Sequence, residues 1–154
     1  MKFCENNNLG IKLYRDALDL AADAHQGQVD KSGNDYFEHP LRVSTPFIQS
    51  GDATAAIVSL LHDCVEDTWV TLGFLEDRFP EEIVDAVDAL TRREDETYRH
   101  YIRRLCRNDI ARRVKMEDIK DNLRPDRLFP GAPLERYRRA QAWIQGYELT
   151  GKFD

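Results

Sequence analysis

The stretch Leu60-Leu61-His62-Asp63-Cys64-Val65-Glu66-Asp67-Thr68 decides how this sequence is interpreted. It follows a mainly apolar run, residues 53–59, and places four ionisable side chains at the end of that run. Charged groups next to a buried segment are costly unless they are paired or bound to a metal. The stretch therefore indicates either a metal site or, as the plainer alternative, a solvated helix end with an acidic patch.

Helical spacing within this stretch favours the metal site. On a continuous helix over 53–66, His62 and Glu66 share one face, and Asp63 and Asp67 share the adjacent face. A divalent ion such as Mn, Fe or Zn accepts mixed imidazole and carboxylate ligands of the kind that His62 and Asp63 supply. The outer carboxylates, Glu66 and Asp67, could then transfer protons to and from an attacking water.

Two further segments carry candidate ligands. His39 precedes Pro40 at a predicted helix start, and Asp118 lies on the same helix face as Asn122, with Lys115 one turn before it. Taken alone, His39 suits a surface or capping histidine, and the segment around Asp118 suits a solvated charged face. Their importance depends on whether the fold brings them to His62.

The spacing of apolar positions is helical nearly throughout, which predicts an all-α fold. We expect one domain over residues 1–154, forming a compact helical bundle of about seven or eight helices. Gly51 followed by Asp52 predicts a helix end and then an N-cap. The expected helices cover residues 11–27, a segment from 40 to about 50, 53–66, 71–79, 80–90, 94–107, 109–122 and 134–149.

Composition excludes several classes of protein. The 154 residues carry a net charge of −6, and residues 1–90 hold 17 acidic against six basic side chains, which disfavours binding to nucleic acid. No apolar run is long enough to span a membrane, and the first ten residues lack the apolar core of a secretory signal. Three scattered cysteines, Cys4, Cys64 and Cys106, disfavour a disulfide framework and fit a cytoplasmic location.

Together these segments resemble a known family over residues 17–123. They are similar to the HD-domain metal phosphohydrolases, and specifically to the RelA/SpoT-type alarmone hydrolases that have a single hydrolase domain and no synthetase domain. The most specific motif is the stretch 60–68, which is close to the LLHDxVEDT signature of that family. The other similar blocks are AHQGQ at 24–28, KSG at 31–33, HP at 39–40, LTRR at 90–93 and KMEDIKDNL at 115–123.

The resemblance implies a role for each matching residue. The metal ligands would be His39, His62, Asp63 and Asp118, with Mn²⁺ as the ion and Zn, Fe or Co as other candidates. The catalytic pair would be Glu66 and Asp67, and the substrate-binding residues would be Lys31, Ser32, Tyr98, Lys115 and Asn122. His25 is similar to a motif residue that is not a ligand, and we interpret it as a buried hydrogen-bonding histidine.

The activity implied is a guanosine 3′,5′-bis(diphosphate) 3′-pyrophosphohydrolase that releases GDP and pyrophosphate. The partner would be a small nucleotide, and the protein could be a homo-oligomer. One departure concerns Asp30, which stands where the family often has an arginine that packs against the base. Asp30 could accept hydrogen bonds from a guanine edge or could signal another nucleotide. Two alternatives therefore stay open: an HD-type nucleotidase or phosphatase with a different substrate, and a non-catalytic nucleotide-binding HD module.

Overall fold

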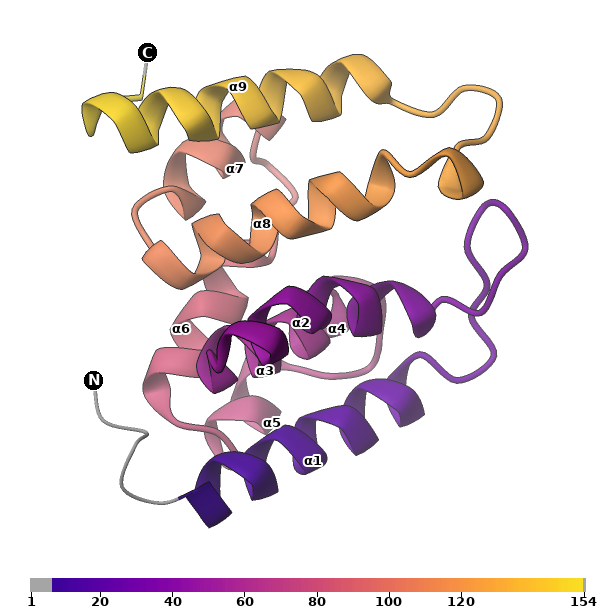
Figure 1. Cartoon of the computed structure of the whole chain (residues 1–154), viewed down its shortest axis with the longest axis vertical. Helices are drawn as coiled ribbons and strands as arrows, with labels where there is room; N and C mark the ends of the chain where they lie inside the picture. Colours follow the sequence, from indigo (N-terminus) through magenta and orange to yellow (C-terminus); the bar gives the residue numbers. More distant parts are fainter. Residues whose placement is uncertain (1–6, 154) are drawn as a thin grey trace.

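The computed structural model describes residues 7–153, and these residues form the all-α bundle that the sequence predicts (Figure 1). Within this range no strand forms, apart from an isolated bridge between Val29 and Asp35. The helices are α1 (Asn7–Ala24), α2 (Glu38–Ser50), α3 (Ala53–Leu61), α4 (Cys64–Asp67), α5 (Leu72–Glu76), α6 (Glu81–Leu90), α7 (Tyr98–Leu105), α8 (Asp109–Asn122), the 3-10 helix η2 (Pro125–Arg127) and α9 (Leu134–Thr150).

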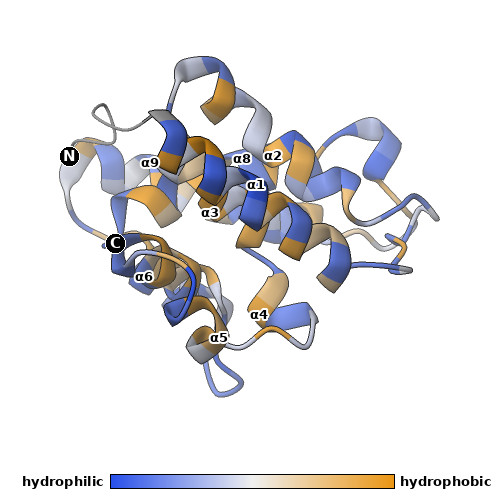
Figure 2. Cartoon of the chain, turned by 90° about the horizontal axis from the view of Figure 1, so that it is seen from below, coloured by the Kyte–Doolittle hydropathy of each residue, from blue (hydrophilic) through white to orange (hydrophobic). Residues whose placement is uncertain are grey.

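Helix α3 forms the centre of the core. Every residue from Ala55 to Leu61 is buried, and the helix packs against α1, α2, α6 and α8. A helix that is apolar on all sides requires such neighbours on all sides, because any face left open would expose apolar surface to water. Figure 2 shows the surrounding helices with hydrophobic and hydrophilic residues on different sides. The core thereby fixes the C-terminal end of α3, where His62 follows.

Local signals set the start of α3 as expected. Gly51 adopts a left-handed conformation with φ 78° after α2, a conformation that costs glycine little. The side chain of Asp52 then accepts a hydrogen bond from the backbone N–H of Ala55. The predicted helix end and N-cap are both confirmed.

The expected helix over 53–66 is not continuous, which corrects one prediction. His62 and Asp63 lie in a turn between α3 and α4. Consecutive residues of a regular helix point about 100° apart, whereas this turn allows both side chains to approach the same point. The predicted continuity of the helix through His62 and Asp63 is therefore wrong, although the backbone N–H of Asp67 still donates to the carbonyl oxygen of Asp63 at 3.0 Å.

Two loops from distant parts of the sequence meet at one end of the bundle. The segment 25–37, between α1 and α2, lies beside the segment 123–133, which contains η2 (Figure 1). Helix α9, which follows the second loop, packs on α7 and α8.

Among residues 7–153, no helix is long and apolar enough to cross a membrane. Cys64 and Cys106 are buried free thiols, and Cys4 lies outside the described residues.

Candidate metal centre and its cavity

Four predicted ligands converge on one point although they come from three different segments. Nε2 of His39 lies 3.1 Å from Asp118 Oδ1 and 3.7 Å from Asp63 Oδ2. Nε2 of His62 lies 3.0 Å from Asp63 Oδ2 and 3.7 Å from Asp118 Oδ1. The start of α2, the α3–α4 turn and the middle of α8 therefore supply a compact set of two nitrogens and two oxygens.

The second nitrogen of each imidazole, Nδ1, already makes a hydrogen bond within the protein. Nδ1 of His62 lies 2.6 Å from the carbonyl oxygen of Ser59, and Nδ1 of His39 lies 2.7 Å from Asp121 Oδ2. Because a carbonyl or carboxylate oxygen accepts, each Nδ1 carries the proton, and each Nε2 presents a lone pair to the centre.

This arrangement fits a divalent cation. Nε2 of His62 is buried and makes no hydrogen bond to any described residue, although a carboxylate oxygen is close. A lone pair facing a carboxylate is unfavourable unless a cation lies between them. Ligand bonds of about 2.0–2.2 Å to nitrogen and oxygen place neighbouring donors roughly 3 Å apart, in agreement with the observed spacing.

Supporting contacts keep both carboxylates ionised and oriented. Lys115 Nζ lies 2.7 Å from Asp118 Oδ2, and Asn122 Nδ2 donates to Asp118 Oδ1 at 2.7 Å. Burial favours the neutral form of Asp118, but the charge of Lys115 holds the pKa of its carboxyl well below the usual range. The hydroxyl of Tyr36 donates to Asp63 Oδ2.

The predicted catalytic pair lies beside this centre. Carboxylate oxygens of Asp63, Glu66 and Asp67 lie within 4.8 Å of one another. Glu66 Oε1 accepts a hydrogen bond of 2.8 Å from the backbone N–H of Arg92, which links α4 to the segment after α6. Glu66 lines the adjoining cavity and Asp67 does not. Desolvation and the charges of Asp63 and Glu66 raise the pKa of Asp67 to about 6.

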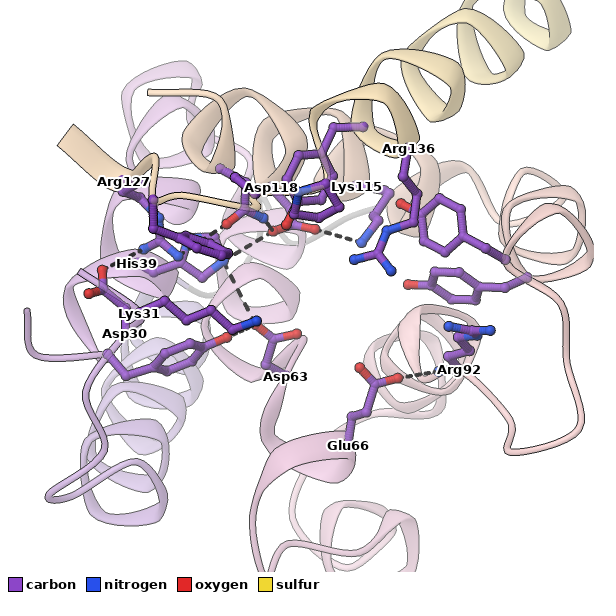
Figure 3. Close-up of a pocket in the computed structure, with 18 of the residues that line it drawn as sticks. Asp30, Lys31, His39, Asp63, Glu66, Arg92, Lys115, Asp118, Arg127 and Arg136 are labelled. Atoms are coloured by element: carbon purple, nitrogen blue, oxygen red, sulfur yellow. Dashed lines mark hydrogen bonds and ion pairs between the residues drawn. The ribbon is translucent and has the colours of Figure 1, made fainter. Parts of the chain in front are cut away.

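The centre opens into a cavity of about 420 Å³, a size typical of small-ligand sites. Figure 3 shows Asp63 and Glu66 on the lower side of it, Lys115 and Arg136 above, and Arg92 at the right. Arg136 lies over the ring of Tyr98 at 5.0 Å. The cavity therefore combines an anionic centre with a cationic rim, which suits a ligand that carries phosphates.

Most of the predicted site residues line this cavity. They are Lys31, His39, Asp63, Glu66, Tyr98, Lys115, Asp118 and Asn122. His62 lies beneath it, buried, while Ser32 is exposed and does not line it. His25 is fully buried, with Nδ1 2.7 Å from Gln28 Oε1, so its interpretation as a hydrogen-bonding histidine is confirmed.

Asp30 does not present a free carboxylate to the cavity. Its Oδ1 accepts hydrogen bonds of 2.9 Å from the backbone N–H groups of Ser32 and Asn34. Its Oδ2 lies 3.8 Å from Nη1 of Arg127, and its side chain is 7% exposed. The carboxylate thus organises its own loop and pairs with the facing one.

Sequence reasoning missed several residues of the site. Tyr36, Asp121, Arg127, Phe129 and Arg136 contact predicted residues or line the cavity. Asp121 carried a usable signal, because it lies three residues after Asp118 and one before Asn122 on α8. Arg127 and Phe129 carried none, because they follow the helix in a segment without periodicity.

Comparison with known proteins decides the family. Residues 17–121 match the HD domain family. This chain belongs to the HD-domain family. That match includes all four converging side chains, so the candidate centre of this HD-domain protein lies within the region shared with its family.

Individual relatives are similar over most of this HD-domain chain. It is 31% identical over 145 residues to a probable GTP pyrophosphokinase of Mycobacterium leprae, covering 88% of this chain and 18% of the relative. It is 36% identical over 140 residues to a guanosine-3′,5′-bis(diphosphate) 3′-pyrophosphohydrolase of Haemophilus influenzae, covering 83% of this chain and 20% of the relative. The chain thus spans about a fifth of the length of these curated relatives.

A solved structure has a similar fold. It is described as a metazoan ortholog of SpoT that hydrolyzes ppGpp and plays a role in starvation responses. The two structures superpose with a TM-score of 0.69 at 26% sequence identity, covering 86% of this chain and 82% of the other. The similarity therefore extends over most of both chains.

Proposed function

We propose that this chain is a metal-dependent phosphohydrolase that cleaves guanosine 3′,5′-bis(diphosphate) to GDP and pyrophosphate. The observation that carries the proposal is Nε2 of His62, which makes no hydrogen bond to any described residue. It lies among three other potential metal-ligand atoms, at the floor of a cavity with a cationic rim. The names of the Haemophilus relative and of the metazoan structure support the choice of substrate.

In this proposal His39, His62, Asp63 and Asp118 hold the ion. Two imidazoles and two carboxylates suit Mn²⁺, and Zn, Fe or Co could also bind such a set. When bound, the ion would lower the pKa of water and stabilise negative charge on phosphate oxygens. Lys115 and Asn122 would hold Asp118 in place, and Tyr36 would do the same for Asp63.

The remaining chemistry falls to side chains of the cavity. A water oxygen would attack the phosphorus of the 3′-diphosphate, and the bond from that phosphorus to the ribose oxygen would break. Glu66, which faces the cavity, would accept the proton of the water, with Asp67 as the second carboxylate of the pair. The Glu66–Asp67 pair would then give this proton to the departing ribose oxygen, so GDP and pyrophosphate result.

The cationic rim would bind the phosphates. Lys31, Lys115, Arg92 and Arg136 supply positive charge around the cavity. Tyr98 would offer an aromatic surface, and Asn122 a polar contact. Arg93, the second arginine of the block LTRR, instead pairs with Asp88 and does not line the cavity. Ser32 keeps its proposed substrate role only if substrate binding brings it closer.

We further propose that residues 1–154 act as one HD-type domain. A nucleotide substrate and the two buried free thiols support a cytoplasmic location. Association into a homo-oligomer stays a prediction.

The test is hydrolysis of guanosine tetraphosphate by the purified protein with Mn²⁺, with products separated by chromatography. We expect GDP and pyrophosphate, and their loss together with bound metal in Asp63→Ala. A panel of nucleoside monophosphates, run in parallel, tests for an HD-type nucleotidase. Hydrolysis of a nucleoside monophosphate but not of guanosine tetraphosphate would identify an HD-type nucleotidase. Binding of a nucleotide without hydrolysis of any would favour a non-catalytic module.

A further inference from the structure

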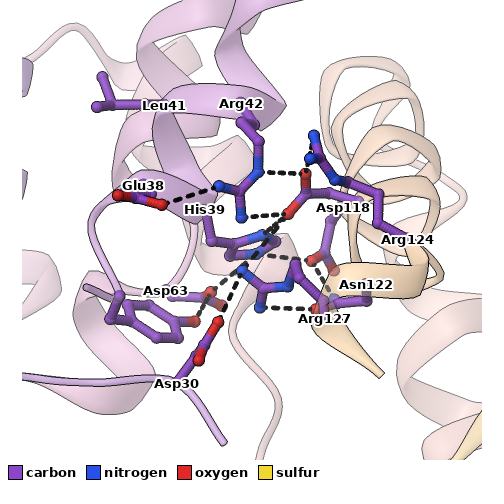
Figure 4. Close-up of polar contacts among 12 residues, drawn as sticks. Asp30, Glu38, His39, Leu41, Arg42, Asp63, Asp118, Asn122, Arg124 and Arg127 are labelled. Atoms are coloured by element: carbon purple, nitrogen blue, oxygen red, sulfur yellow. Dashed lines mark hydrogen bonds and ion pairs between the residues drawn. The ribbon is translucent and has the colours of Figure 1, made fainter. Parts of the chain in front are cut away.

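The proposed metal ligands and the proposed catalytic carboxylates are held in place by different means. His39 is fixed from behind by Asp121, which in turn accepts hydrogen bonds from Arg42 (Figure 4). Glu66 lies on α4, a helix of four residues of which Cys64 alone is buried, and its own side chain is exposed. A general base must be held in a defined geometry to act, so a contact from outside α4 has to orient this carboxylate.

The backbone N–H of Arg92 makes that contact. It donates to Glu66 Oε1 at 2.8 Å, and Figure 3 shows the two groups together at the edge of the cavity. Within residues 7–153 the carboxylate makes no other hydrogen bond, so Oε2 stays available to a water. An adjacent cation would disfavour protonation of the carboxylate, whereas a backbone N–H orients it without a full positive charge.

The N–H of Arg92 can orient Glu66 only if its own loop is fixed. Residues 91–97 join α6 to α7 without regular structure, and most of their side chains are exposed. Loops of this kind are usually more mobile than the helices they connect. Nε and Nη2 of Arg92 donate to the carbonyl oxygen of Glu96 at 3.0 and 2.9 Å. This contact closes the loop on itself but does not attach it to a helix.

Arg104, on α7, provides the attachment. Its Nε and Nη2 each donate to a carboxylate oxygen of Glu96 at 2.8 Å, and Nη2 also donates to the carbonyl oxygen of Thr91 at 2.9 Å. Its Nη1 donates to the carbonyl oxygens of Asp88 and Ala89, in the last turn of α6, at 3.4 and 3.3 Å. One guanidinium thus binds the end of α6 and both ends of the loop.

We propose that Arg104 is a positioning residue for the hydrolysis, because it fixes the loop whose Arg92 N–H orients Glu66 toward the cavity. Arg104 does not line the cavity, so it acts through the loop and not on the substrate. The planar fork of the guanidinium is required, because a single ammonium group cannot serve Glu96 and Thr91 in the same geometry. This inference rests on the proposed function, since it takes Glu66 as the proton acceptor.

The first test measures hydrolysis of guanosine tetraphosphate by the Mn²⁺-loaded protein and its variants. We expect kcat to fall about 10- to 100-fold in Arg104→Gln, since misplacement of a catalytic group by about 1 Å has effects of this size. Arg104→Lys keeps the charge but not the fork, so it should also lose turnover. Metal content should stay stoichiometric in both. Arg103→Gln, which replaces an exposed arginine of the same helix, is the matched control and should retain full turnover.

Two further readouts separate positioning from a general loss of structure. Residues that act as a unit have non-additive effects, so adding Arg104→Gln to Glu66→Gln should lower kcat by less than about twofold more. The second readout is exchange of the Arg92 backbone amide with solvent, followed by NMR without substrate. Because Arg104→Gln frees the loop, this amide should exchange about tenfold or more faster than in the unaltered protein, and Arg103→Gln should leave its exchange unchanged.

Three results would overturn the inference. They are an unchanged kcat in both Arg104 variants, full additivity of Arg104→Gln with Glu66→Gln, and unchanged exchange of the Arg92 amide in Arg104→Gln. Circular dichroism identifies a variant that fails to fold, in which case Arg104→Lys decides. If the unaltered protein hydrolyses guanosine tetraphosphate and the Arg104 variants equal it, only this inference fails. If it hydrolyses no nucleotide, the proposed function fails, and exchange of the Arg92 amide still decides whether Arg104 fixes the loop.

Discussion

Asp121 and His39 form a buried pair in which the carboxylate Oδ2 lies 2.7 Å from the imidazole Nδ1. Arg42 donates to Asp121 Oδ1 through Nε at 2.7 Å and so fixes the carboxylate in turn. Burial favours the neutral form of Asp121, but the hydrogen bonds from His39 and Arg42 outweigh it and lower its pKa to about 2. An ionised carboxylate behind a ligand histidine fixes the tautomer and orientation of the ring.

Replacing Asp121 should therefore weaken metal binding. In Asp121→Ala, His39 loses the acceptor for its Nδ1 proton, and the proper orientation of Nε2 is no longer enforced. We expect metal affinity to fall about 10- to 100-fold, measured by calorimetry with Mn²⁺. Asp126→Ala removes an exposed carboxylate and should leave the affinity unchanged. Equal affinity in both variants would assign Asp121 a purely structural role.

Replacing Glu66 should separate catalysis from metal binding. The amide of Glu66→Gln can still accept the hydrogen bond from the backbone of Arg92, so the local structure should persist. It cannot take a proton from water, and we expect turnover of guanosine tetraphosphate to fall roughly 10²- to 10⁴-fold. Metal content, measured on the same sample, should stay stoichiometric. Unchanged turnover would remove Glu66 from the mechanism.

The stability of the fold should depend strongly on α3. Ile57 is fully buried at the centre of the core, so Ile57→Ala leaves a cavity that its neighbours fill only in part. We expect the free energy of unfolding to fall by about 2–5 kcal/mol, measured by chemical denaturation. Ile48 is 48% exposed, and Ile48→Ala should change the free energy of unfolding by less than about 0.5 kcal/mol. Similar losses at the two positions would contradict the central place of α3.

The helices were predictable because each is set by local signals. The bounds expected for 109–122 agree with α8, and the cap at Asp52 begins α3 as expected. The break at His62 and Asp63 was not predictable, because nothing in that apolar and acidic run resembles a helix terminator. This turn nevertheless creates the site, since it directs both side chains to His39.

Site residues were predictable where they belong to a motif and not where they act across loops. His39 and Asp118 are 79 residues apart, yet each lies in a block that resembles the family. Arg127 and Asp30 meet only because two loops lie side by side. Asp30 illustrates the difference. From the sequence, it indicated altered contacts to the nucleotide base, whereas the structure shows it paired with Arg127.

The segment that carries Arg92 should be stabilised by one ion pair in a pH-dependent way. Arg104 donates to both oxygens of Glu96 at 2.8 Å, and these hydrogen bonds outweigh desolvation and lower the pKa of Glu96. Because that pKa is lower in the folded state, the stabilisation is present above the unfolded value of about 4.3. It is lost as the pH falls through the folded value. Relative to Glu96→Gln, the protein should be about 1–3 kcal/mol more stable at pH 7. In urea titrations this difference should shrink as the pH falls below about 4, whereas the exposed Glu135→Gln should show no such trend. A difference that does not vary with pH would mean that the charge of Glu96 contributes nothing.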